Sequence, residues 1–137
     1  MSVWLIDTGP IVAYLDRTDP RHRKVTRVLE PFAGRLITTS AVITEAMQLL
    51  ADARNGPALL ARFVEAADVQ VMECTDAVQL RRAAGLMRKY ADAPMDFADA
   101  TLVLLADAIA TTDIATLDRR GFVIYRTPSG RHFHLVV

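Results

Sequence analysis

Five acidic side chains occupy positions from which a parallel α/β sheet would bring them to one edge: Asp7, Glu45, Asp96, Asp99 and Asp118. Asp7 follows the apolar run VWLI and precedes a Gly-Pro turn, so it is expected at the carboxyl end of a strand, where α/β proteins bind ligands. Asp96 and Asp99 are three residues apart at the start of an apolar helical segment, which places both side chains on one helix face. Two such charges at about 4 Å repel by roughly 4 kcal/mol at an effective dielectric constant of about 20. A divalent cation would convert that repulsion into attraction, so the pattern predicts a metal site.

The ligand chemistry of such a site favours Mg²⁺ or Mn²⁺, because both ions prefer hard oxygen ligands. Either ion makes a bound water more acidic, and a neighbouring carboxylate can accept the proton that is released. These acids therefore predict hydrolysis of a phosphodiester. Asp7 and Asp99 are predicted as direct metal ligands, and Asp96 and Asp118 as ligands directly or through water. Glu45 is predicted to orient the ligands from outside or to act as general base.

Each acid also has a purely structural interpretation. Asp7 can cap the helix that follows it. Asp96 and Asp99 can complement the dipole of their helix, an effect worth about 0.3 to 1 kcal/mol for each, although one acid would suffice. Glu45 taken alone is typical of a solvated helix residue, and Asp118 of a turn. The combination of all five at corresponding places in the α/β pattern is what favours a site.

The elements that must position these acids alternate along the chain. Short apolar runs predict strands at 3–6, 36–38, 69–72, 114–116 and 122–125, with an edge strand at 133–137. Helical spacing of apolar residues predicts helices at 11–15, 21–32, 41–53, 58–67, 77–90 and 96–109, with Ser40 and Asp76 as N-caps. Parallel strands need such crossover helices. The order therefore predicts an α/β protein with a doubly wound, mostly parallel sheet and helices on both faces.

Length and composition limit the possible classes of protein. With 137 residues, 52% of them apolar, the chain is expected to form one domain over residues 1–137. The formal net charge is zero, so RNA would have to be held by a local patch or through metal. The single cysteine, Cys74, excludes an internal disulfide. The start of the chain has no basic leader, and the longest apolar run is cut by Asp107. We therefore expect no signal peptide, no membrane contact and a cytoplasmic location.

Basic side chains gather most densely between residues 17 and 27. This stretch contains Arg17, Arg21, His22, Arg23, Lys24 and Arg27. It has two interpretations, a solvated helix face or a surface that contacts phosphates, and the sequence does not separate them. A second basic group, at residues 119, 120, 126 and 131, falls near the proposed acidic edge.

Four segments carry a resemblance to a known family. They are LIDTGPIVAYLD at 5–16, TSAVITEAMQLL at 39–50, MDFADATLVLLAD at 95–107 and IATLDRRGF at 114–122. Together they resemble the PIN-domain ribonucleases, and within them the VapC-type toxins of toxin-antitoxin pairs. The resemblance implies a three-layer α/β/α sandwich whose acids bind Mg²⁺ or Mn²⁺ to hydrolyse RNA. It also implies a homodimer and a cognate antitoxin protein whose tail covers the acidic pocket.

The resemblance can be carried over residue by residue. It places the family's acids on Asp7, Glu45, Asp99 and Asp118, with Asp96 as an extra acid found in some members. Thr116 matches a hydroxyl residue that is frequent two places before the last acid, and Thr8 is common after the first. Both threonines are expected to support the acids.

Other classes of protein also place an aspartate after a strand. A haloacid-dehalogenase-like phosphatase would use a second aspartate two residues after Asp7, and this chain lacks it. A response-regulator receiver would need a lysine after a later strand, but the only lysines are Lys24 and Lys89. A catalytically silent PIN-fold interaction module is a third alternative, against which the intact acids argue. The sequence favours a metal-dependent endoribonuclease, the toxin of a type II toxin-antitoxin system.

Overall fold

Five parallel strands form the centre of the protein. The computed structural model describes residues 1–137, with β1 at Val3–Ile6, β2 at Arg35–Thr39, β3 at Gln70–Met72, β4 at Asp113–Ala115 and β5 at His134–Leu135. The strand order is β3-β2-β1-β4-β5, and in it Leu5 pairs with Ile37 on one side and Ile114 on the other. The chain adds β2 and β3 on one side of β1 and then returns to the other side for β4. The seam between β1 and β4 is therefore the switch point, where doubly wound sheets open a ligand crevice.

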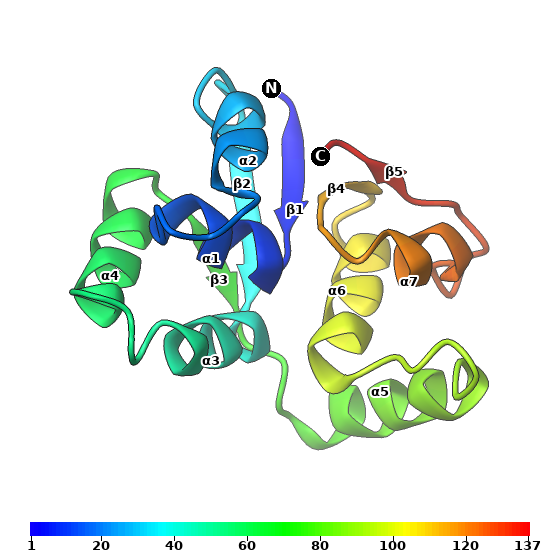
Figure 1. Ribbon diagram of the computed structural model, residues 1–137. Coiled ribbons are helices and arrows are strands. Elements are labelled where there is room, and N and C mark those ends of the chain that lie inside the picture. Colours follow the sequence, from blue (N-terminus) through cyan, green and yellow to red (C-terminus); the bar gives the residue numbers. More distant parts are fainter.

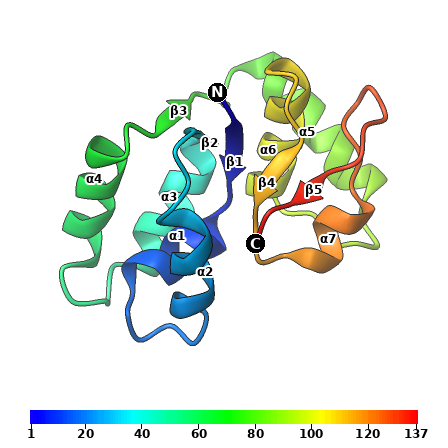
Figure 2. The ribbon, with the colours of Figure 1, turned by 90° about the horizontal axis from the view of Figure 1, so that it is seen from above.

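Helices connect each strand to the next. They are α1 at Thr8–Leu15, α2 at His22–Leu29, α3 at Ser40–Leu49, α4 at Gly56–Ala66, α5 at Ala77–Lys89, α6 at Phe97–Ala108 and α7 at Arg119–Ile124. In both views α1 to α4 lie on one side of β1 and α5 to α7 on the other (Figures 1 and 2). This is the predicted three-layer α/β/α sandwich. None of these helices is both long and apolar enough to cross a bilayer.

The core is one cluster of 27 buried apolar residues. The most enclosed helix is α6, in which eight of twelve residues are buried. A helix that is apolar on nearly every face must lie inside the protein, and α6 contacts both α5 and β2. Its first turn carries Asp99, so the packing of α6 forces a carboxylate below the surface.

The segment predicted as a strand at 122–125 is helical, so that prediction was wrong. Phe122 and Tyr125 are fully buried, whereas Val123 and Ile124 are 59% and 51% exposed. Burial at a spacing of three residues is helical, not the alternation of a strand. Four consecutive apolar residues are compatible with a strand or with a helix. The packing of Phe122 and Tyr125 into the core favours the helix α7.

Helix α3 also differs from its prediction in its cap. Thr39, not Ser40, is the N-cap, and its side chain accepts a hydrogen bond from the Val42 N–H. Ser40 is the first helical residue, and its hydroxyl lies 3.3 Å from the sulfur of the buried Cys74. The other elements occur where they were predicted, with shifted ends.

Candidate active site

Asp7 occupies the seam of the sheet. It follows β1 directly and caps α1, and its side chain accepts a hydrogen bond from the Thr8 N–H at 2.8 Å. Its own N–H donates to the Ala115 carbonyl at the end of β4, at 3.0 Å. Only 6% of Asp7 is exposed. A carboxylate is thus fixed between β1 and β4, the two parallel strands at which the order of strand addition reverses.

Thr116 connects the first acid to the last. Its hydroxyl is buried and donates to Asp7 Oδ2 at 2.7 Å. Thr116 Oγ1 in turn accepts the Asp118 N–H at 3.0 Å. One short side chain therefore ties Asp7 to the turn that carries Asp118.

Asp96 and Asp99 begin α6 with a reciprocal cap. Asp96 Oδ1 accepts the Asp99 N–H at 2.8 Å, and Asp99 Oδ2 accepts the Asp96 N–H at 3.2 Å. This is the capping role that the sequence left open, and it uses one oxygen of each carboxylate. The other oxygen of each accepts no hydrogen bond within the protein. Asp99 is buried and Asp96 is exposed, so the pair reaches from the interior to the surface.

Asp118 lies three residues beyond the end of β4 and caps α7. Its Oδ1 accepts the Gly121 N–H at 3.1 Å. A Cβ at residue 121 would collide with Asp118 Oδ2 and would lie 2.7 Å from the hydroxyl oxygen of Tyr125. Residue 121 must therefore be glycine for the carboxylate and the tyrosine to share this space. No local pattern in the sequence places Gly121 or Tyr125 at the acids.

Glu45 faces the same region from α3. It is half-buried, and its charge contributes to raising the pKa of Asp7. Its helix is joined to α6 by two buried hydroxyls, because Thr39 Oγ1 lies 2.8 Å from Thr101 Oγ1. These two threonines were also missed, since nothing in the sequence pairs residues so far apart.

The acids are electrostatically strained. The pKa of Asp7 is raised from its ordinary 3.8 to about 6, because burial and the charges of Asp96 and Glu45 raise it by more than the hydrogen bonds to the carboxylate lower it. The pKa of Asp99 is raised from 3.8 to about 8, first by burial and then by the charges of Asp7 and Asp96. The charges of Asp96 and Glu45 therefore act on Asp7, and those of Asp7 and Asp96 act on Asp99, although these residues come from distant parts of the chain.

No basic side chain balances this charge. The only ion pairs are Arg21 with Asp19 and His134 with Asp113. The hydroxyl of Thr8, beside Asp7, is buried without a hydrogen-bond partner. Hard oxygen donors, unbalanced negative charge and an unpaired hydroxyl fit a divalent cation in chemical type. No group of three or more His, Cys, Asp or Glu side chains lies close enough together to hold a metal ion. The acidic side chains would therefore have to move to bind one.

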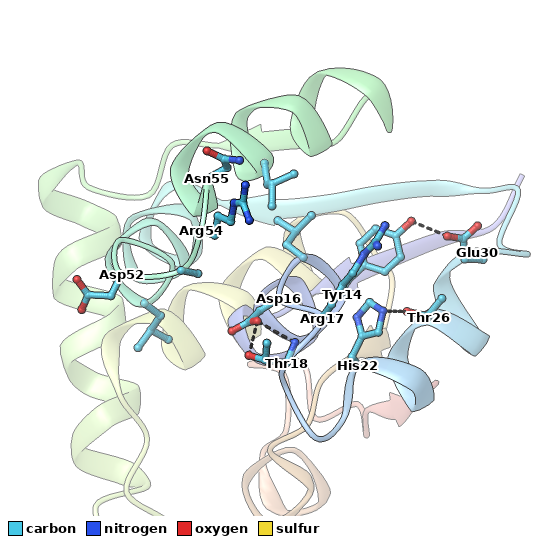
Figure 3. A pocket seen from close by; sticks show the side chains of 14 residues that line it. Tyr14, Asp16, Arg17, Thr18, His22, Thr26, Glu30, Asp52, Arg54 and Asn55 are labelled. Carbon is cyan, nitrogen blue, oxygen red and sulfur yellow. Dashed lines mark hydrogen bonds between the residues drawn. The ribbon is translucent and has the colours of Figure 1, made fainter.

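A large groove lies away from the acids. It has a volume of about 1370 Å³ and is lined by residues of α1 to α4 and of the connections after α1, α2 and α3, none of them one of the five acids (Figure 3). From the basic stretch it receives Arg17 and His22, but Asp16, Glu30 and Asp52 also line it. The groove is therefore mixed in charge and not a uniformly basic track.

The fold and the site together define a class of protein: a PIN-like α/β/α sandwich with buried acids at its switch point. No family model matches the chain. Ribonuclease VapC26 of Mycobacterium tuberculosis is 34% identical to it over 134 residues, which cover 96% of this chain and 98% of that protein.

A solved structure supports the fold. The crystal structure of Mycobacterium tuberculosis VapC20, described as a toxin that cleaves the sarcin-ricin loop, has a TM-score of 0.73 and 20% sequence identity. The match covers 82% of this chain and 87% of that one. At this identity the likeness shows the fold, while the likeness to VapC26 shows the family. The chain belongs to the VapC ribonucleases, which confirms the resemblance inferred from the four segments.

Proposed function

We propose that this protein is a Mg²⁺- or Mn²⁺-dependent endoribonuclease and the toxin of a toxin-antitoxin pair. The observation that carries the proposal is the pair Asp7 and Asp99. Both are buried, both have raised pKa values, and neither has a cationic partner. A charge cluster of this kind, in a chain of the VapC ribonuclease family, is what a divalent cation would neutralise.

Each acid has a proposed part in holding the cation. Asp7 and Asp99 would be its direct ligands, and Asp96 and Asp118 would contribute directly or through water. When bound, the cation would supply a more acidic water and stabilise negative charge on the phosphate. Glu45 would orient this set from outside or accept a proton.

The threonines support this arrangement from the protein side. Thr116 donates to Asp7 Oδ2, so Asp7 has one oxygen turned toward the seam in a fixed direction. Thr8 Oγ1 lies buried beside it with no partner, available to donate to a water or a phosphate oxygen. We therefore infer that both hydroxyls orient groups at the acidic site.

The partners follow from the family. We infer that RNA is the substrate, that a cognate antitoxin inhibits the enzyme, that the active form is a homodimer, and that the protein acts in the cytoplasm, where RNA and antitoxin are made. The names of VapC26, a ribonuclease, and VapC20, a toxin, support the first two inferences. Light scattering of the purified protein tests the third.

The decisive experiment measures cleavage of a fluorogenic RNA after metal removal with EDTA and after Mg²⁺ or Mn²⁺ is restored. We expect Asp7→Asn and Asp99→Asn to lower the cleavage rate by about a hundredfold or more. Removing a metal ligand should reduce activity at least as much as removing a residue that hydrogen-bonds to a ligand. Asp113→Asn is the matched control, since Asp113 lies at the other end of β4 and pairs with His134.

Four results would contradict the proposal. Full cleavage in EDTA would exclude the metal. Equal losses in Asp7→Asn and Asp113→Asn would exclude the site. Release of phosphate from p-nitrophenyl phosphate without RNA cleavage would indicate a phosphatase, and RNA binding without cleavage a silent interaction module.

A further inference from the structure

Two tyrosines join the connection between α5 and α6 to the end of α7. The Tyr125 hydroxyl donates to the Ala93 carbonyl at 3.0 Å. In the opposite direction, the Arg126 N–H donates to the Tyr90 hydroxyl at 3.0 Å. The two rings meet edge to face, with centroids 5.1 Å apart. Two hydrogen bonds and one aromatic contact therefore fasten these segments together.

The fastened segments are those that carry acids. Ala93 lies three residues before Asp96, the N-cap of α6, and the connection has no other side-chain hydrogen bond between Ala91 and Met95. Tyr125 is the residue that ends α7, whose N-cap is Asp118. The Tyr125 hydroxyl thus links the elements that begin with these two aspartates.

The Tyr125 hydroxyl also lies at the acids themselves. Its oxygen and Asp118 Oδ2 pack against the same face of Gly121, where no Cβ would fit. The side chain is fully buried, and burial raises its pKa above the usual range. The charges of Asp99 and Asp118 add to that increase. A neutral hydroxyl is therefore held beside the carboxylates throughout the physiological pH range.

We propose that Tyr125 is a positioning residue of the acidic site: through the Ala93 carbonyl its hydroxyl sets where α6 begins relative to α7, and so sets the placement of Asp96 and Asp99 against Asp118. This inference deepens the proposed function and rests on it. The Tyr125 hydroxyl is hydrogen-bonded to a backbone carbonyl and not to a carboxylate. It acts through the backbone that presents the ligands.

The substitution Tyr125→Phe isolates the hydroxyl. Phenylalanine keeps the edge-to-face contacts with Phe122 and Tyr90 and removes only the bond to Ala93. Tyr14→Phe is the matched control, because its hydroxyl donates to Glu30 at the exposed groove, away from the acids (Figure 3). Both variants should fold.

Three readouts test the inference. In metal-free protein, amide hydrogen exchange of residues 93–99, followed by mass spectrometry, should be faster in Tyr125→Phe and unchanged in Tyr14→Phe. Affinity for Mn²⁺, measured by calorimetry, should fall about five- to tenfold, near the lower end of the effect of losing a partner of a metal ligand. In RNA cleavage, kcat should fall by a similar factor while KM is unchanged.

The inference is overturned if Tyr125→Phe has the same rate of amide hydrogen exchange at residues 93–99 and the same affinity for Mn²⁺ as the wild type. It is equally overturned if only Tm falls while kcat and Mn²⁺ affinity remain, because that result defines a merely structural tyrosine. If the wild type neither binds Mn²⁺ nor cleaves RNA, the proposed function fails. The exchange experiment then still decides whether Tyr125 positions the start of α6.

Discussion

Replacing Asp7 by asparagine should make the metal-free protein more stable while removing its response to metal. The pKa of Asp7 rises from 3.8 to about 6 in the folded protein. Each tenfold change in proton affinity corresponds to about 1.4 kcal/mol, so the ionised carboxylate costs about 3 kcal/mol at pH 7. Asparagine removes the charge but accepts on one oxygen only, which weakens the bonds from Thr8 and Thr116 by about 1 to 2 kcal/mol. The net gain is about 1 to 2 kcal/mol.

The assay is thermal unfolding in EDTA and in saturating Mn²⁺. In EDTA, Tm of Asp7→Asn should exceed that of the wild type by roughly 5 °C. A hundredfold excess of Mn²⁺ over its Kd stabilises a binding-competent protein by about 2.7 kcal/mol, so the wild type should gain Tm and the variant should not. Asp113→Asn, at an exposed ion pair, should change neither measurement.

One result would refute this reasoning. If Asp7→Asn is less stable than the wild type in EDTA, Asp7 serves mainly as the cap of α1, and its burial is not an electrostatic cost. The metal site would then lose its principal physical argument.

Three further predictions concern the surroundings of the acids. Because the pKa values of Asp7 and Asp99 are raised, the folded protein binds their protons more tightly than the unfolded chain. Their contribution to stability should therefore be complete below about pH 4 and be lost as the pH rises to about 8. The free energy of unfolding in urea should show this loss in the wild type and not in the Asp7→Asn/Asp99→Asn variant. Thr116→Val should weaken Mn²⁺ binding about tenfold in calorimetry, because it removes the donor to Oδ2; unchanged affinity would contradict its supporting role. Gly121→Ala should lower the free energy of unfolding by about 1 to 3 kcal/mol. Gly85→Ala is the control and should raise it by about 0.5 to 1 kcal/mol, because a Cβ at residue 85 would have no neighbouring atom within 4 Å. Equal effects of the two substitutions would show that the space around Gly121 is not restrictive.

Much of this architecture could be predicted because its causes are local in the sequence. The run VWLI followed by an aspartate defines β1 and places Asp7 at the carboxyl end of a strand. The apolar residues of α6 and the acids three apart at its start define a buried helix with a charged N-terminus. Local patterns of this kind are sufficient for α/β order and for the end of the sheet where the acids lie.

The remaining features depend on contacts that no local pattern contains. The apolar residues 122–125 fit a strand until the burial of Phe122 and Tyr125 on one side is known. Three consecutive residues around the start of α3 carry hydroxyl groups, and each could cap the helix. Because β2 ends at Thr39, this residue is the N-cap. The bond from Tyr125 to Ala93 joins residues 32 positions apart, so the sequence alone gives no reason to connect them.

The hydrogen bond between Thr116 and Asp7 spans 109 positions of sequence, and this separation has a consequence for biosynthesis. A ribosome makes the chain from the N-terminus at about 5 to 20 residues per second, so Asp7 emerges long before its partner. Until then the nascent polypeptide lacks the hydroxyl that fixes Asp7, and a copy interrupted before Thr116 never acquires it. The order of the strands thus delays assembly of the acidic site until β4 and Thr116 have been made.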